Sequence, residues 1–509
     1  MFLNNLVSSF IRNEKRVLFR GLDWKRTYGQ VWSGAGSTMK RWKDVHPVMM
    51  MDPRTKVCIV RDNGVLWLEE FLAAQRLYKS VVLLSPKMPV SILQSKIRSM
   101  GPSVLVCADD PKLMSMQPPP LSLQTVHKSS LTNEETITLV TSGSSSGMSR
   151  QEVVLPTSCL QANLDQINTV VDKGMMDGDD VSLSILPWSH CYGLVCELLC
   201  LVHRGGSLFL PEGYPVKDVM REAKPTLLFV VPFVLQRLLE RLGSLKRVAC
   251  SGNGWWTNLG GGSVLNRMCF GGRLRNISVG GACSDTEMLR GFQEAFGTKI
   301  YEGYGMTETS PMVSLNTNLA YKLGSVGQPL PGVEVRIDPT TEEILVRGKN
   351  VVQNLDPDRY LTIDHKRFYR TGDRGRVDDQ GFLFVVDRLK DHFKLNNGLF
   401  IYPVRIEEVF NRFLPRHIQQ WIVVQDPRPG RGSQLVLVGI IMEKSIDNIH
   451  HLTPEELEKI GRSGNLMTYE IPKTVYYLTP TETVDMFTEK QTPRRAMIRE
   501  HILRQVSKK

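Results

Sequence analysis

Two short segments of the sequence combine small residues with groups that bind phosphate or metal ions. The segment "TLVTSGSSSGMSR" follows a strand-like run, and its backbone N–H groups and serine hydroxyls can surround a phosphate. The Walker A pattern GxxxxGK[ST] is absent from it. The segment "YEGYGMTETS" (residues 301–310) brings glycines, hydroxyls and carboxylates together within ten residues. It buries little apolar surface, which indicates a segment shaped to hold a polar ligand.

The composition is that of an ordinary globular protein. The chain has 509 residues, of which 41% are apolar and 23% charged, enough for a large core and more than one domain. Its formal net charge of +11 indicates an anionic partner. The charge alone does not choose among a nucleotide, phosphate, nucleic acid and a membrane surface, and a solvated basic surface without such a partner is the alternative. From the motifs described below we expect a nucleotide and no nucleic acid, with peripheral contact with a membrane surface as a further option.

Cysteine usage and the N-terminus bear on location. The nine cysteines contain no CxxC pair and mostly lie in apolar surroundings, which indicates reduced core thiols. We therefore expect a cytoplasmic protein. The N-terminal segment "MFLNNLVSSFIRNEKRVLFR" is basic and amphipathic. We interpret it as a first helix, with a mitochondrial targeting segment as the alternative.

The hydrophobic pattern predicts an α/β fold. Strand-like and helix-like runs alternate from residue 57 to 110, and again from 135 to 305, which is typical of parallel sheets. After Pro329 the period falls to about two, so we expect an antiparallel subdomain. We predict a large multi-subdomain N-terminal domain (residues 1–388) and a small, mobile α+β C-terminal domain (residues 389–509).

Two helices have local signals in the sequence. The helix predicted from "SDTEMLRGFQEAF" takes Ser284 as its N-cap, and Glu287 completes a capping box. The last helix of the chain carries Ile498, Ile502 and Val506 on one face, so we expect that face to pack on the small domain.

The order of the motifs resembles that of the adenylate-forming superfamily, which includes acyl-CoA synthetases, luciferases and peptide-synthetase adenylation domains. The resemblance covers nearly the whole chain and is most specific in "YGMTE" and in the run from "YRTGD" to "DRLKDHFKLNNGLFIYPVRIEE". The run "FGGRLRNISVGGA" and the spacing in "KLNNG" are most similar to fatty-acyl ligases. The matching segments, in order, are 141–147, 187–193, 279–282, 304–308, 369–373 and 387–408.

This resemblance implies an AMP-forming acid–thiol ligase, a fatty acid–CoA ligase. Such enzymes join a carboxylic acid to AMP with ATP and Mg²⁺, release pyrophosphate, and pass the acyl group to the thiol of CoA. Two alternatives remain open. The acceptor is an acyl carrier protein, or the chain is a catalytically degenerate relative that binds a nucleotide or acyl ligand.

The resemblance also implies roles for residues around the nucleotide. In this family Glu308 would hold Mg²⁺ and Thr307 would contact the phosphate, whereas Asp373 and Arg388 would bind the ribose. Further residues match the adenine and acyl pockets, namely Gly280, Gly281, Ala282, Tyr304 and Gly305. Those that match the phosphate loop are Thr141, Ser142, Gly143, Ser144, Ser145, Gly147 and Arg150.

Two more residues match the substrate side of the family's site. His190 in "PWSHCYG" takes the place of a residue between the acyl pocket and the thiol entrance, and Gly193 lies in the same segment. Gly281 is expected to border the acyl group as well as adenine.

The C-terminal lysines show a departure from the family pattern. Lys390 falls at the family's domain hinge, and Lys394 resembles a lysine that serves the transfer half-reaction. The family's catalytic lysine near the C-terminus falls on Thr492, and Lys490 lies two residues away. We expect a local shift that brings Lys490 into place; without it, adenylation is impaired.

Overall fold

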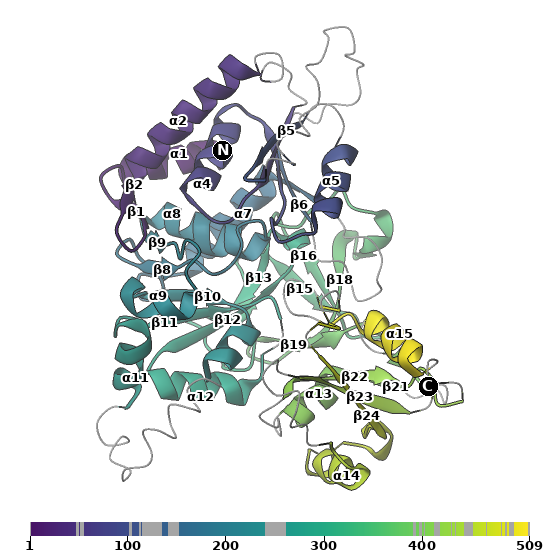
Figure 1. Cartoon of the computed structure of the whole chain (residues 1–509). Coiled ribbons are helices and arrows are strands. Elements are labelled where there is room, and N and C mark those ends of the chain that lie inside the picture. The colour runs from purple at the N-terminus through teal and green to yellow at the C-terminus, as the bar shows by residue number, and fades with distance from the viewer. Residues whose placement is uncertain are drawn as a thin grey trace.

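The computed structural model describes most of the chain. The described residues are 2–46, 50, 55–100, 104–110, 113, 135–140, 152–239, 261–282, 284–389, 393–395, 400–401, 403–411, 418–428, 430–432, 434–441, 451–464, 466–479, 481–483, 486–487 and 493–506. Figure 1 shows the N-terminal elements at the upper left and the C-terminal elements at the lower right.

The largest sheet has nine strands in the order β14-β13-β12-β11-β10-β8-β9-β1-β2. Its central strands, from β12 through β9 to β1, run parallel, as the alternating pattern predicts. Parallel strands covered on both faces are apolar throughout, and all four side chains of β10 are buried. The strands are β1 (Val17–Arg20), β2 (Lys25–Thr27), β8 (Val181–Leu183), β9 (Ser207–Phe209), β10 (Leu227–Val230), β11 (Asn276–Val279), β12 (Lys299–Gly305), β13 (Met312–Leu315) and β14 (Gln328–Pro329).

Helices cover both faces of this sheet. Because side chains alternate along a strand, Leu227 and Phe229 of β10 pack on one side, with α7, the π-helix η1 and α8. Leu228 and Val230 pack on the other side, with α9, α11 and α12. The bounds are α7 (Thr157–Val170), η1 (Tyr192–Leu199), α8 (Cys200–Arg204), α9 (Val216–Ala223), α11 (Gly261–Phe270) and α12 (Thr286–Phe296).

A second sheet has five strands in the order β5-β3-β4-β6-β7, parallel except for β7. The N-terminal segment is a helix, as predicted, and its Phe10 contacts Tyr28 of α2. The strands are β3 (Lys56–Val60), β4 (Ser80–Leu83), β5 (Val104–Ala108), β6 (Thr136–Val140) and β7 (Glu152–Pro156). The helices are α1 (Phe2–Arg12), α2 (Tyr28–Val45), α4 (Val65–Arg76) and α5 (Val90–Ser99).

The antiparallel subdomain predicted after Pro329 is confirmed. Its sheet follows the order β15-β16-β18-β17, and β19 also pairs with β18. Gly381 lies in the turn between β18 and β19 at a φ of +80°, which favours glycine. The strands are β15 (Glu334–Ile337), β16 (Glu343–Arg347), β17 (Tyr360–Ile363), β18 (Lys366–Val377) and β19 (Leu383–Arg388).

The C-terminal elements mix helices with a three-stranded sheet, β22-β23-β24. Trp421 of β22 lies against Gly439, where an added Cβ would meet the indole ring at 2.5 Å. Ile498 and Ile502 of α15 are fully buried against this sheet, as predicted. The domain boundary at residue 388 remains a prediction. The bounds are β20 (Phe393–Lys394), β21 (Phe400–Ile401), α13 (Pro403–Asn411), β22 (Ile418–Gln425), β23 (Leu435–Ile441), α14 (Pro454–Ser463), β24 (Thr474–Leu478) and α15 (Arg495–Val506).

The predicted N-cap of α12 is wrong by one residue. Asp285 caps the helix, which begins at Thr286, and its carboxylate accepts a hydrogen bond from the N–H of Met288 at 3.0 Å. Ser284 and Glu287 therefore do not form the expected capping box. A carboxylate suits this position because it also interacts favourably with the helix dipole.

Every described cysteine is free, and all of these except Cys269 are buried. Within the described residues, no helix is both long enough and apolar enough to cross a membrane. The cellular location remains a prediction.

Candidate functional site

The carboxyl ends of β11 and β12 border a cavity, here called the mouth cavity. Beyond β11, Gly281 has a φ of +82°, and a Cβ on Gly280 would lie 3.3 Å from the carbonyl oxygen of Gly303 on β12. Small residues thus keep the backbone exposed at the point where open α/β sheets bind ligands. The lining includes His190, Tyr192, Ser278, Gly280, Gly305 and Thr307.

The "YGMTE" segment ends β12 and continues into a one-turn 3-10 helix, η3 (Thr307–Thr309). The Thr309 hydroxyl donates to the carbonyl oxygen of Pro311 at 2.6 Å and accepts from the N–H of Met306 at 3.1 Å. These bonds fix the turn, so Thr307 lines the mouth cavity while Glu308 lies beside it, largely buried.

Glu308 is suited to a metal that also binds phosphate. Its turn contacts β7, the strand that follows the Ser/Gly-rich segment. Mg²⁺ in such sites takes one or two carboxylates and completes its shell with substrate phosphates and water, so a single carboxylate fits. The described residues contain no cluster of three or more His, Cys, Asp or Glu side chains that could hold a metal ion. Burial raises the pKa of Tyr369, and the negative charge of nearby Glu308 adds to this effect.

Three predicted residues from separate motifs meet in one cluster. The Tyr304 hydroxyl donates a hydrogen bond to Asp373 Oδ2 at 2.7 Å, and Arg388 Nε lies 3.2 Å from Asp373 Oδ1. Asp373 and Arg388 are partners across β18 and β19. Burial raises the pKa of Tyr304 well above its usual range, and the Asp373 carboxylate adds to it, so the phenol remains a neutral donor.

This cluster borders a large cleft that also touches the C-terminal elements. The cleft is lined by Phe233, Gly281, Ala282, Asp373, Arg388 and Arg495, among others. Glu302 of β12 lies in its wall, and burial raises the pKa of this carboxyl to about 7 although the N–H of Gly324 donates to it at 2.8 Å. The sequence analysis did not single out Glu302, because its apolar surroundings come from distant segments.

His190 and Gly193 have different surroundings. His190 lines the mouth cavity, as expected of a residue near the substrate. Gly193 has a packing explanation, since a Cβ there would meet the carbonyl oxygen of Pro187 at 2.6 Å. The hydroxyl of Tyr192, two residues after His190, donates a hydrogen bond to the Ser278 hydroxyl at 3.1 Å. Neither Tyr192 nor Ser278 was singled out from the sequence.

A second, largely apolar cavity lies between the nine-stranded sheet and the helices α7 and η1; we call it the apolar cavity. It shares Ser278 and Met312 with the mouth cavity. Its lining includes Val171, Met175, Met176, Cys196, Phe229 and Tyr301.

Several predicted site residues lie outside the described residues. These are the phosphate-loop positions Thr141, Ser142, Gly143, Ser144, Ser145, Gly147 and Arg150, and the C-terminal positions Lys390, Lys490 and Thr492. Lys394 belongs to the short strand β20. The roles of all these residues remain predictions.

The chain belongs to the AMP-binding enzyme family, whose sequence model matches residues 51–353. This match confirms the resemblance to adenylate-forming enzymes. Among sequence relatives, long-chain fatty-acid–CoA ligase 5 of Mus musculus is 26% identical over 348 residues, which cover 58% of this chain and 50% of the relative. The 2-succinylbenzoate–CoA ligase of Bacillus cytotoxicus is 27% identical over 61% of this chain and 60% of the relative. The matched part thus spans about half the length of the first of these relatives.

Solved structures confirm the fold across nearly the whole chain. O-succinylbenzoate coenzyme A synthetase from Bacillus subtilis, in complex with AMP, superposes with a TM-score of 0.73 at 19% identity over 97% of this chain and 98% of that one. ATP-bound MatB from Rhodopseudomonas palustris gives a TM-score of 0.72 at 20% identity over 98% and 99%. The predicted α/β fold class is therefore confirmed.

Proposed function

We propose that this protein activates a carboxylic acid with ATP and passes the acyl group to the thiol of CoA, and that the acid is a fatty acid. Family membership and the names of the fatty-acid–CoA ligase relatives support this proposal. The observation that carries it is the contact between Tyr304 and Asp373. This hydrogen bond links Asp373, a carboxylate suited to binding the ribose, to Tyr304 of β12. The turn that follows β12 carries Glu308.

In the first half-reaction, a carboxylate oxygen of the acid attacks the α-phosphorus of ATP, and the bond to pyrophosphate breaks. Asp373 and Arg388 would hold the ribose, while the glycines at the mouth cavity let adenine and acid approach the backbone. Thr307 would donate to a phosphate oxygen. Mg²⁺, held by Glu308 together with phosphate oxygens, would neutralise charge on the phosphates.

In the second half-reaction, the thiol sulfur of CoA attacks the acyl carbon, the thiol proton is released, and AMP leaves. His190 lines the mouth cavity and is the candidate to border the incoming thiol. Lys390 would act as the hinge about which the C-terminal domain rotates, and Lys394 would serve the transfer step. The acceptor could instead be an acyl carrier protein, and competition between the two thiols separates these cases.

Carboxylate-dependent exchange of labelled pyrophosphate into ATP tests the proposal, run over short, long and aromatic acids. Glu308→Gln and Asp373→Asn should each lower exchange about thirtyfold to a thousandfold, because each removes one preorganised contact worth about 2–4 kcal/mol. Glu287→Gln, on the exposed surface of α12, is the matched control and should keep full exchange. Undetectable exchange with every acid would favour the degenerate, non-catalytic alternative, and normal exchange in both site variants would end the residue assignment.

A further inference from the structure

The apolar cavity runs along one face of the nine-stranded sheet. Alternate residues of a strand share a face, so the sequence of β11 and β12 shapes the cavity from one edge of the sheet to the other. At the carboxyl edge both strands present glycine, which leaves the mouth open. At the amino edge they present larger side chains. Along this face the order is Asn276 and Ser278 on β11 with Gly280 directly after it, and Tyr301, Gly303 and Gly305 on β12.

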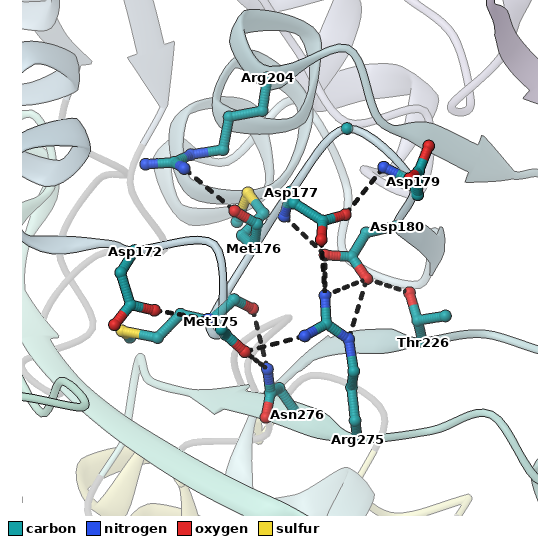
Figure 2. A network of polar contacts seen from close by, with 12 residues as sticks. Asp172, Met175, Met176, Asp177, Asp179, Asp180, Arg204, Thr226, Arg275 and Asn276 are labelled. Carbon is teal, nitrogen blue, oxygen red and sulfur yellow. Dashed lines mark hydrogen bonds and ion pairs between the residues drawn. The ribbon is translucent and has the colours of Figure 1, made fainter.

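The inner end of the apolar cavity is bordered by two methionines on a firmly held segment. Met175 and Met176 line the cavity and are both 6% exposed. Asn276 Nδ2 donates to the carbonyl oxygen of Met175 at 2.9 Å, and Arg204 donates to that of Met176 at 3.0 Å. Arg275 donates to the carbonyl oxygen of Gly174 at 2.9 Å. The backbone that carries the two methionines is therefore held by hydrogen bonds from three side chains (Figure 2).

Arg275 is itself held by a buried carboxylate. Its guanidinium donates to both oxygens of Asp180 at 2.7 and 2.6 Å, and the side chain of Asp180 is 2% exposed. The Thr226 hydroxyl donates to the same carboxylate at 2.6 Å. Figure 2 shows this network, and its members Asp180, Thr226 and Arg275 directly precede β8, β10 and β11, respectively. A bidentate pair of this kind, with its carboxylate buried, resists movement of the segment.

A polar link divides the apolar cavity from the mouth cavity. The Tyr192 hydroxyl donates to Ser278 at 3.1 Å, and Ser278 lines both cavities. An alkyl chain that passed from the mouth cavity into the apolar cavity at this point would have to displace this one hydrogen bond.

We propose that the apolar cavity receives the alkyl tail of a straight-chain acid, and that Met175 and Met176 limit this tail to about ten carbons. The proposal rests on the proposed function, since it takes the acid's carboxylate to lie in the mouth cavity. From Gly280 to Asn276 is four residues of strand, or about 13 Å. An extended chain of single bonds advances about 1.2 Å per bond, so this length accommodates about ten carbons. The tail is thus shorter than those named for the long-chain ligase relatives.

Direct binding tests this limit without catalysis. Calorimetric titration with the sodium salts of straight-chain acids from four to sixteen carbons, and with benzoate, measures the dissociation constants. Each methylene added within the cavity should lower the dissociation constant roughly fourfold, the equivalent of about 0.8 kcal/mol. The gain should stop near ten carbons. An affinity that rises steadily through sixteen carbons, or benzoate as the tightest ligand, would overturn the proposal.

Variants then test the residues. In the double variant Met175→Ala/Met176→Ala the gain should continue for two or three more carbons, whereas Met268→Ala, at a 52% exposed site on α11, should leave the limit unchanged. Ser278→Leu should abolish the increase in affinity beyond about six carbons, because the leucine side chain would fill the space between the mouth cavity and the apolar cavity. A folded double variant with an unchanged limit contradicts the proposal, and if that variant fails to fold, the Ser278→Leu result decides.

Pyrophosphate exchange with the same acids separates the two proposals. Should the chain-length limit and its shift appear in binding while no acid supports exchange, the proposed function fails and the assignment of the cavity stands. Should exchange occur with acids of sixteen carbons as readily as with ten, in wild type and variants alike, the proposed function stands and the limit set by the methionines fails.

Discussion

Replacement of Gly305 by alanine would place a methyl group inside the backbone of the neighbouring strand. The added Cβ would lie 1.7 Å from the carbonyl oxygen of Pro311 and 3.1 Å from the Cα of Met312. Cβ atoms in real structures essentially never come within 3.0 Å of such an atom, so the added methyl group and the Pro311 carbonyl must move apart by about 1.3 Å, the difference between 3.0 and 1.7. That movement also strains the hydrogen bond from Met306 N–H to Pro311, now 2.9 Å long.

The expected cost follows from these contacts. Overpacking costs about 1–3 kcal/mol, and the upper end applies because the obstacle is backbone rather than a flexible side chain. Weakening one buried hydrogen bond adds about 1 kcal/mol. We therefore expect Gly305→Ala to lower the free energy of unfolding by about 3–4 kcal/mol. The turn that carries Thr307 and Glu308 should also be displaced, with a loss of AMP affinity of at least tenfold.

Gly291→Ala provides the matched control. Gly291 lies within α12, and a Cβ there would meet no atom within 4 Å. Alanine favours a helix over glycine by up to about 1 kcal/mol, so this variant should be slightly more stable than the wild type and bind AMP normally. Urea denaturation followed by circular dichroism, with calorimetry for AMP, measures both effects. Equal stability and equal AMP affinity of the two variants would refute the steric argument.

Two further predictions concern a buried carboxyl and the C-terminal lysine. Burial raises the pKa of Glu197 to about 8, against the opposing effect of hydrogen bonds from Ser182 and Ser184. The folded protein binds this proton more tightly than the unfolded chain does, so the stabilisation is complete below about pH 4.5 and is lost as the pH rises towards 8. Relative to wild type, Glu197→Gln should therefore gain up to about 4 kcal/mol in unfolding free energy between pH 5 and pH 8, and parallel pH profiles would contradict this assignment. If Lys490 takes the place of the family lysine, as we propose, Lys490→Ala should lower pyrophosphate exchange about a hundredfold, because it would remove a positive charge beside the reacting phosphate. If Lys490→Ala is silent while Thr492→Lys raises exchange, Lys490 does not replace the family lysine.

The fold could be predicted from the sequence where the pattern is local. Runs such as "LLFV" and the period of two after Pro329 identified the parallel and antiparallel sheets, because burial of one or both faces dictates the periodicity. The start of α12 was missed by one residue. Ser284 and Asp285 are both good N-caps, and the choice depends on backbone geometry that the sequence does not express.

In the candidate site, residues that belong to specific motifs could be predicted, whereas contacts between distant segments could not. Tyr304, Asp373 and Arg388 were found because each belongs to a motif whose order is specific, and the structure brings the three side chains together. The network beneath the apolar cavity was not found, since Arg275 and Asp180 are 95 positions apart. Although Arg275 lies in the run "FGGRLRNISVGGA", nothing in the sequence pairs it with Asp180. Such pairs depend on strand register in the folded sheet.

The packing of Trp421 against Gly439 gives the C-terminal sheet its own optical signal. Trp421 is the only tryptophan that follows Trp256 in the sequence, and it is 1% exposed. Its fluorescence should be blue-shifted in the folded protein and move to longer wavelength when β22, β23 and β24 separate. Subtracting the emission of Trp421→Phe from that of the wild type isolates this signal. Melting of the last sheet can therefore be timed against melting of the rest of the chain, with no added label.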